Sequence, residues 1–256
     1  QTFENIEIIC INDGSVDHSL SIMEEYARMD SRIIIINQTN KGPAETRNVG
    51  LSVACGKYIL FLDSDDYYSA NACERIYKEI QEKNEPDAVI FGTNLFPEEP
   101  RASEWHYWVL DTPDIYYESI DDSLLLTKPY LRVYSWRCCF KKEFIDINSL
   151  KFNTAFKYGE DALFMFEAVI KLKGIAVISD KLYNYRHFNQ DSLMNQISKD
   201  YVVFTSLISA SIGAFGTWAS LGNYMMAVVL IVLFSFILMI VYNLICILIA
   251  EISSFN

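Results

Sequence analysis

The 256-residue sequence predicts an α/β protein with a mostly parallel sheet flanked by helices, followed by a C-terminal transmembrane helix. Three features lead to this prediction. Strand-like and helix-like segments alternate through the first 100 residues, acidic turns follow two of the strands, and residues 225–250 form an apolar run without a charged side chain. Together they divide the chain into a globular domain, residues 1–200, and a membrane tail, residues 201–256.

The alternation in the first 100 residues sets the expected order of elements. It predicts strands at 5–12, 32–37, 57–62 and 87–96, and helices at 16–30, 43–55 and 70–84. Strand–helix–strand repetition at this spacing is typical of parallel strands joined by crossover helices, which cover both faces of the sheet. Pro43 suits the first turn of its helix, and Gly56 suits the C-terminal end.

The second half of the globular domain is less regular. Residues 100–135 are rich in aromatic and acidic side chains, and we expect an irregular segment that covers one side of the sheet. Regular patterns return afterwards, and they predict strands at 133–140, 175–179 and 182–188 and a helix at 160–173 that ends at Gly174.

The membrane tail contains no charged residue between Asp200 and Glu251. As a helix, residues 225–250 would span about 39 Å, enough to cross a hydrocarbon core of roughly 30 Å. The less apolar residues 201–220 could form a hairpin with this helix or lie flat in the membrane interface. The sequence leaves both alternatives open.

The distribution of charge bears on partners and location. The chain has a formal net charge of −12, which disfavours nucleic acid as a partner. All 21 Lys and Arg residues precede the membrane tail, so the positive-inside rule places the globular domain on the cytoplasmic side of a membrane. The six cysteines show neither a disulfide framework nor metal-binding spacing, which agrees with that side.

The stretch ILFLDSDD, residues 59–66, ends an apolar strand with three carboxylates. Crowded like charges repel each other, and a shared cation would relieve this repulsion. Asp63 and Asp65 can direct oxygens to one point, which suits Mg²⁺ or Mn²⁺ with phosphate oxygens completing the shell. The alternative is a solvated acidic turn in which Asp66 or Ser64 caps the next helix.

Other polar residues are expected at the same edge of the sheet, where α/β proteins bind ligands. Asp13 ends another strand, Gly14 permits a tight turn, and this carboxylate can accept hydrogen bonds from a base or a ribose. Lys41 and Arg47 lie near this edge, and the fork of Arg47 suits phosphate oxygens. The first turn lacks the G-x-G-x-x-G of a nucleotide-binding dehydrogenase, which disfavours that class.

Four stretches occur in a recognisable order and spacing: QTFENIEIICINDGSVD, NKGPAETRNVGLSVACGKYILFLDSDD, YSWRCCFKKEFI and YGEDALFMFEAV. Together they resemble the family 2 glycosyltransferases of the GT-A fold, the fold of nucleotide-diphospho-sugar transferases. The resemblance covers roughly residues 1–195, and the four motifs together are more specific than any one of them.

The resemblance implies a donor site and a metal site. Donor contacts would come from Asp13, Lys41, Arg47, Asp63 and Arg186. The cofactor would be Mn²⁺ or Mg²⁺, held by a DxD-type motif and a histidine: Asp65, Asp63 and His187. The alternative for His187 is a surface position without a function.

The resemblance also assigns the acceptor side. Asp161 would be the general base of the family's ED motif, with Glu160 beside it as an orienting residue or acceptor contact. The alternative for Asp161 is a stabilising charge at a helix N-terminus. Trp136 would help to shape the acceptor side, and a plain core position is an equal alternative.

These roles imply a hexosyltransferase-type glycosyltransferase (EC 2.4). Such an enzyme moves a sugar from a nucleotide-diphosphate sugar to an acceptor hydroxyl and inverts the anomeric centre. We expect a glycan or lipid-linked acceptor at a membrane, and a part in cell-surface polysaccharide synthesis. The alternative is a non-catalytic, membrane-anchored scaffold that keeps a decayed transferase domain.

Two elements of the family are expected ahead of QTFENIEI. A family member would begin with a strand and a helix, roughly 30 residues ahead of this stretch, so we expect an N-terminally truncated domain. The expected consequence is a vacancy between the strands at 5–12 and 57–62. We also expect poor folding or weak donor binding, because buried backbone groups without partners are costly.

Overall fold

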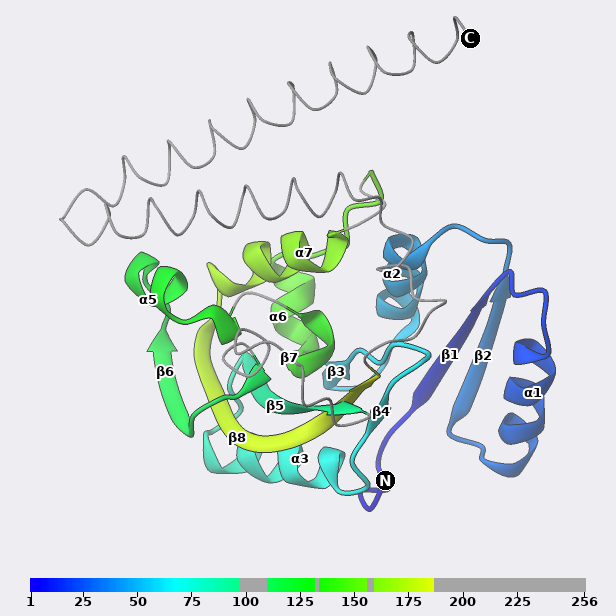
Figure 1. The fold of residues 1–256 in the computed structure, drawn as a ribbon, viewed down its shortest axis with the longest axis horizontal. Coiled ribbons are helices and arrows are strands. Elements are labelled where there is room, and N and C mark those ends of the chain that lie inside the picture. The colour runs from blue at the N-terminus through cyan, green and yellow to red at the C-terminus, as the bar shows by residue number, and fades with distance from the viewer. Residues whose placement is uncertain (97–109, 132–133, 156–158, 187–256) are drawn as a thin grey trace, which may run out of the picture. The chain divides into compact units, whose positions relative to one another are not determined.

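The computed structural model describes residues 1–96, 110–131, 134–155 and 159–186, which belong to the unit Gln1–His187 (Figure 1). Up to residue 96, the strands and helices that the sequence predicts are present in the predicted order. The differences begin with the way in which the strands pair.

The first sheet consists of two parallel strands, β1 (Ile8–Asp13) and β2 (Ile33–Gln38). They pair in register, so their last residues, Asp13 and Gln38, lie opposite each other at one edge. Helix α1 (Ser19–Met29) connects the strands and packs on them, yet it buries none of its own residues. The first sheet therefore contributes little to the main core.

The second sheet has six strands in the order β3, β7, β5, β8 and β4, with β6 also paired to β8. The strands are β3 (Tyr58–Leu60), β4 (Tyr67–Tyr68), β5 (Ala88–Phe96), β6 (Ile115–Ser119), β7 (Cys138–Lys141) and β8 (Lys173–Arg186). The first six residues of β5 are all buried, which is the pattern of a strand covered on both faces.

The second sheet is mixed, so the prediction of a mostly parallel sheet is wrong here. β5 and β8 are parallel, whereas the pairs β3–β7, β5–β7, β4–β8 and β6–β8 are antiparallel. Two of the antiparallel pairs arise from β7, which enters between β3 and β5 in the opposite direction. Local alternation does not reveal this insertion, because the pairing joins segments that are far apart in the sequence.

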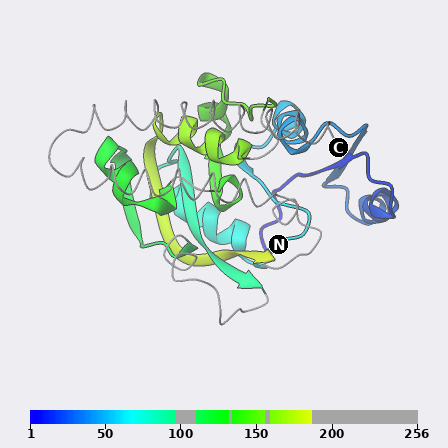
Figure 2. The ribbon, with the colours of Figure 1, turned by 45° about the horizontal axis from the view of Figure 1, so that its top comes forward.

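Helices lie on both faces of the second sheet, as predicted. Helix α3 (Ala72–Glu82) packs on β5 and β8, and Figures 1 and 2 show α6 (Lys142–Ile147) and α7 (Glu160–Val169) on the opposite side. Further described helices are α2 (Pro43–Val53), α5 (Asp122–Thr127) and the short 3₁₀ helices η1 (Pro129–Leu131) and η2 (Ser135–Arg137).

Two predicted features around α7 and β8 are wrong. α7 ends at Val169 rather than at Gly174, which lies inside β8 with a φ of 72°. The two strands predicted after α7 are one strand, β8, because its ladder with β5 continues through a register shift at Gly92. A Cβ on Gly92 would lie 3.2 Å from the carbonyl oxygen of Asp180, so glycine allows this close approach.

The aromatic segment predicted as irregular contains regular elements where it is described. β6 forms a strand along β8, and α5 begins after Asp121, whose side chain accepts a hydrogen bond from the backbone N–H of Leu124 at 2.8 Å. Residues 97–109 lie outside the described residues. The segment thus extends the sheet in a way that its composition did not indicate.

β1 and β3 do not pair with each other. Among the described residues, β1 pairs with β2 and β3 pairs with β7. Glu7, which precedes β1, contacts the segment before β3, because its carboxylate accepts hydrogen bonds from the backbone N–H groups of Cys55 and Gly56. This arrangement is the one expected if a further strand belongs between β1 and β3, and that strand stays a prediction.

None of the described helices combines the length and the apolar character needed to cross a membrane. The predicted transmembrane helix at 225–250, and the hairpin it could form with 201–220, lie outside the described residues. The membrane tail therefore stays a prediction.

Candidate active site

Asp13, the last residue of β1, is held in one orientation by three hydrogen bonds. Its Oδ1 accepts from Gln38 Nε2 at 2.8 Å and from the Lys41 N–H at 2.9 Å, and its Oδ2 accepts from the Gly42 N–H at 2.9 Å. Partial burial alone would raise the pKa of Asp13, but these bonds outweigh it and lower the pKa. An oriented, ionised carboxylate therefore stands at the carboxyl end of β1.

The turn after Asp13 depends on glycine. Gly14 has a φ of 75°, and a Cβ there would lie 2.7 Å from the backbone nitrogen of Asn40. This close approach brings the loop after β2 against the end of β1, so that Lys41 reaches Asp13 through its backbone N–H. The Lys41 side chain is exposed, and its predicted contact with a donor stays a prediction.

Arg47 joins the two acidic parts of the site. Its Nη2 donates to Asp63 Oδ1 at 2.9 Å, and its Nη1 donates to Glu160 Oε1 at 2.7 Å. Only 18% of the Arg47 side chain and 9% of the Glu160 side chain are exposed, so water screens the pair weakly. Burial alone would lower the pKa of Arg47, but the two carboxylates raise it. Arg47 thus fixes the turn after β3 beside the N-terminus of α7.

Helix α2 places Arg47 through contacts with the segment that precedes α7. The Asn48 side chain donates to the Phe152 carbonyl oxygen and accepts from the Phe152 N–H, both at 2.8 Å. The guanidinium of Arg47 lies over the Phe152 ring, 5.3 Å from its centroid. Phe152 in turn stacks on Phe164 of α7 at 4.2 Å. Core packing therefore sets the position of Arg47, together with its two carboxylates.

Asp63 and Asp66 are the ends of a tight turn, in which the Asp66 N–H donates to the Asp63 carbonyl oxygen at 3.1 Å. The next helix, α3, has Asn71 at its N-cap and no side-chain cap. The alternative in which Asp66 or Ser64 caps this helix is therefore wrong.

The last residues of β8 contact this acidic turn. The Tyr183 hydroxyl donates to Asp66 Oδ2 at 2.6 Å, and the Arg186 N–H donates to Asp66 Oδ1 at 2.6 Å. Arg186 Nε also donates to the carbonyl oxygen of Asp65 at 2.9 Å. Arg186 therefore lies at the turn, as the donor-site prediction requires, and it contacts protein atoms there.

Asp161 is the second residue of α7 and follows the ion-paired Glu160. Burial raises the pKa of Asp161 to about 6; the charges of Glu160 and Asp63 add to this effect, and Arg47 opposes it. A simple helix-start charge would have a lowered pKa, because a helix N-terminus favours the ionised form. The raised pKa instead suits a group that accepts a proton near neutral pH.

Trp136 lies in a buried stack of aromatic rings. Its ring centroid is 4.3 Å from that of Tyr183 and 4.7 Å from that of Tyr134, with the planes nearly parallel. Only 4% of Trp136 is exposed. These contacts favour the core position over a surface that shapes the acceptor.

The structure brings part of the predicted site together. Arg47 contacts both Asp63 and Glu160 directly. Asp13 belongs to a separate group of hydrogen bonds at the end of β1. His187 lies outside the described residues, so its place in a metal shell stays a prediction.

Two residues that organise the site, Asn48 and Tyr183, were not among the residues predicted from the sequence. Asn48 follows Arg47 directly and had no motif of its own. Tyr183 could have been noticed, because YNYR at the end of a strand places Tyr183 and Tyr185 on one face, and Arg186 follows them directly in the sequence.

The acidic turn fits a divalent cation that is bound through few protein ligands. Among the described residues, no group of three or more His, Cys, Asp or Glu is placed to hold a metal ion. Asp63 and Asp65 supply two carboxylates, and Mg²⁺ in enzymes is usually held by one or two carboxylates with substrate phosphates and water. The turn is therefore compatible with a cation that binds together with a diphosphate.

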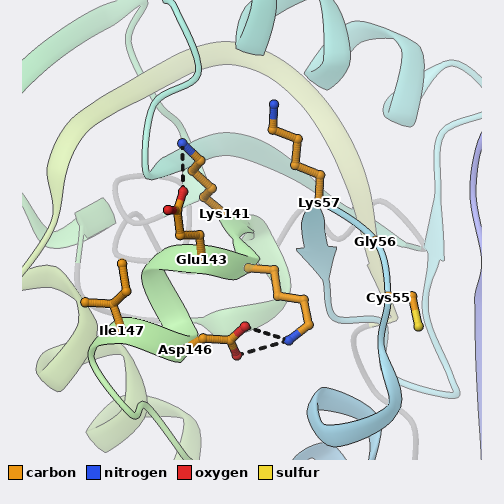
Figure 3. Close-up of a pocket in the computed structure, with 8 residues that line it drawn as sticks. Cys55, Gly56, Lys57, Lys141, Glu143, Asp146 and Ile147 are labelled. Atoms are coloured by element: carbon orange, nitrogen blue, oxygen red, sulfur yellow. Dashed lines mark hydrogen bonds and ion pairs between the residues drawn. The ribbon is translucent and has the colours of Figure 1, made fainter.

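A recess of about 370 Å³ lies apart from these residues; its lining is Cys55, Gly56, Lys57, Lys141, Lys142, Glu143, Asp146 and Ile147 (Figure 3). All three of its lysines are paired with carboxylates: Lys57 with Glu85, Lys141 with Glu143 at 3.4 Å and Lys142 with Asp146 at 2.8 Å. The recess contains none of the predicted site residues and adjoins the amino end of β3, whereas Asp63 follows the carboxyl end. We assign no substrate to it.

The chain is similar in sequence to known glycosyltransferases. The sequence model of glycosyl transferase family 2 matches residues 1–173. The putative glycosyltransferase EpsH of Bacillus subtilis is 33% identical over 191 residues, which cover 73% of this chain and 54% of EpsH. The poly(ribitol-phosphate) beta-glucosyltransferase of Bacillus spizizenii is 31% identical over 184 residues, which cover 71% of this chain and 27% of that protein. The chain spans about half the length of these relatives, or less.

A solved structure also matches the fold. The crystal structure of S. aureus TarS 1–349 in complex with UDP is 25% identical, with a TM-score of 0.59, over 71% of this chain and 51% of the TarS chain. The GT-A type of fold is thereby confirmed, with the mixed sheet described above. The residues that the family model matches include the turn at Asp63, helix α2 with Arg47, and the start of α7 with Asp161. This chain therefore belongs to glycosyl transferase family 2.

Proposed function

We propose that this chain is a metal-dependent, inverting glycosyltransferase of the hexosyltransferase type. The observation that carries the proposal is the double ion pair of Arg47, which places the acidic turn at Asp63 beside Glu160 and Asp161. A donor site and a proton acceptor are both needed for sugar transfer, and this contact brings the two candidate groups together.

The proposed donor is a nucleotide-diphosphate sugar. The similarity to TarS, which was crystallised with UDP, supports a uridine nucleotide as the first donor to test. Asp13 would accept hydrogen bonds from the nucleoside, and Lys41 and Arg186 would approach the phosphates. Asp63 and Asp65 would hold Mn²⁺ or Mg²⁺, which when bound would stabilise the charge that develops on the leaving diphosphate.

In the proposed reaction, Asp161 takes the proton of the acceptor hydroxyl while the oxygen of that hydroxyl forms a bond to the anomeric carbon. The bond between that carbon and the diphosphate oxygen breaks, and its electron pair leaves with the nucleotide diphosphate. A single displacement inverts the anomeric centre. Glu160 and Arg47 keep the base in place, because their ion pair fixes the first turn of α7.

The cellular setting is also a proposal. The apolar run at 225–250 supports a membrane-attached enzyme, and the basic residues before it support a cytoplasmic catalytic domain. A glycan or lipid-linked acceptor, and a part in cell-surface polysaccharide synthesis, would fit that location. The similarity to the poly(ribitol-phosphate) beta-glucosyltransferase of Bacillus spizizenii supports a polymeric acceptor.

The test of the proposed function is donor-dependent release of nucleotide diphosphate by the full chain, with and without Mn²⁺. We expect release that requires the metal, and loss of metal-dependent UDP binding in Asp65→Ala, because one remaining carboxylate cannot rebuild the cation site. Calorimetry with UDP and Mn²⁺ measures the binding. Unchanged affinity in Asp65→Ala would remove the metal assignment, and no release with any donor would favour the non-catalytic scaffold.

A further inference from the structure

The acidic turn, residues 63–66, carries the two proposed metal ligands but lies outside the regular part of the sheet. It connects β3 to the two-residue strand β4. A turn of this length can adopt more than one backbone conformation, so the direction of the Asp63 and Asp65 carboxylates needs a further restraint.

Tyr183 is placed to supply this restraint. Its hydroxyl donates a hydrogen bond to Asp66 Oδ2 at 2.6 Å. The same hydroxyl accepts a hydrogen bond from the backbone N–H of Asp63, with 3.4 Å between the nitrogen and the oxygen. One hydroxyl group therefore contacts both ends of the turn. The Arg186 N–H donates to the other oxygen of Asp66, so both carboxylate oxygens of Asp66 are bonded to β8.

Tyr183 is itself packed within the core. The residue is 0% exposed. Its ring stacks on Trp136 at 4.3 Å and meets Tyr68 edge-on at 5.2 Å. β8 lies between β5 and β4 in the second sheet, which fixes the backbone of Tyr183 as well. Its hydroxyl is thus a fixed point from which the turn can be positioned.

We propose that Tyr183 is a positioning residue for the donor site: through Asp66, it holds the acidic turn in the conformation that directs Asp63 and Asp65 to a common cation. This inference rests on the proposed function, since it assumes that the turn binds a metal with a nucleotide diphosphate. Asp66 in this scheme is a link between the turn and β8 and not a metal ligand.

The variant Tyr183→Phe removes the hydroxyl and keeps the ring stack. We expect its affinity for UDP in the presence of Mn²⁺ to fall about tenfold, the lower end of the usual loss when a group that orients a metal ligand is removed. Calorimetry on the full chain measures this affinity. In an Asp66→Ala background, Tyr183→Phe should cause no further loss, because the link is already broken.

Tyr68→Phe is the matched control. Tyr68 belongs to the same aromatic cluster, and its hydroxyl is hydrogen-bonded to the backbone carbonyl oxygens of Phe61 and Trp136 instead of to the acidic side chains. A purely structural role for Tyr183 would give equal losses of melting temperature and of UDP affinity in the two variants. The positioning role requires that only Tyr183→Phe raises the Mn²⁺ concentration needed for half-maximal UDP binding.

A second measurement keeps the inference separate from the proposed function. Amide hydrogen exchange of residues 63–66 reports the order of the turn without any ligand. We expect faster exchange there in Tyr183→Phe than in Tyr68→Phe. Unchanged exchange would overturn the positioning role, whether or not the wild-type chain binds UDP. Faster exchange together with a wild-type chain that does not bind UDP would leave the link in place and remove the donor assignment.

Discussion

Asp161 and Glu160 are neighbours with different environments. Glu160 is committed to the ion pair with Arg47 at 2.7 Å, whereas the Asp161 side chain accepts a local hydrogen bond from the Ala162 N–H at 2.8 Å. The pKa of Asp161 is raised to about 6 by burial and by the charge of Glu160. The structure therefore divides the ED pair into a residue that fixes α7 and a residue that can exchange a proton.

The variant Asp161→Asn tests this division. We expect turnover to fall by roughly 10² to 10⁴, with UDP affinity nearly unchanged, since only the proton acceptor is lost. Glu167→Gln, on the same helix, is the matched control and should keep its turnover. A loss of UDP affinity without a loss of turnover at saturating donor would contradict the assignment.

The pH dependence of the rate follows from the same carboxylate. Asp161 must be ionised to accept a proton, and with its pKa at about 6 the active form is lost as the pH falls through that value. We expect kcat/KM to be level above pH 7 and to decline tenfold per pH unit well below pH 6. In Asp161→Asn this acidic limb should be absent from the residual rate; its persistence would assign the titration to another group.

Helix α2 is the element that carries Arg47 between its two carboxylates. Its anchor is the reciprocal amide pair between Asn48 and the backbone of Phe152, a residue that is only 2% exposed. Asn48→Ala leaves two buried backbone groups without partners and should lower the free energy of unfolding by about 1 to 3 kcal/mol. Urea unfolding of the full chain measures the change.

Ser52→Ala on the same helix is the control for Asn48→Ala. Ser52 is exposed, and its hydroxyl donates to the Val49 carbonyl oxygen within the helix, so we expect little change in stability. Turnover should also decrease in Asn48→Ala, because Arg47 loses its fixed position. Equal stability of the two variants would show that packing alone anchors α2.

The division of the chain into a catalytic domain and a membrane tail can be tested by deletion. We expect the full chain in the membrane fraction after lysis, and a chain that lacks residues 201–256 in the supernatant with its UDP affinity retained. The reason is that the described contacts of the site all lie within Gln1–His187. Recovery of the full chain in the supernatant, or loss of UDP binding on deletion, would place the tail within the catalytic fold.

The sequence by itself determined the local elements and the residue types of the site. The alternation of apolar segments predicted β1, β2, β3 and β5 and the helices between them, because strand and helix periodicity are properties of short windows. Pro43 marked the start of α2, and the DSDD turn and the ED pair were found from their positions after a strand and before a helix. These inferences needed no knowledge of distant contacts.

Only the tertiary structure decided how these parts meet. The insertion of β7 between β3 and β5, the two carboxylate partners of Arg47, and the hydrogen bond from Tyr183 to Asp66 each join residues that are distant in the sequence. The raised pKa of Asp161 likewise depends on how much protein covers it. Pairing direction, ion-pair choice and desolvation are set by packing in three dimensions, and for this reason a local sequence pattern does not contain them.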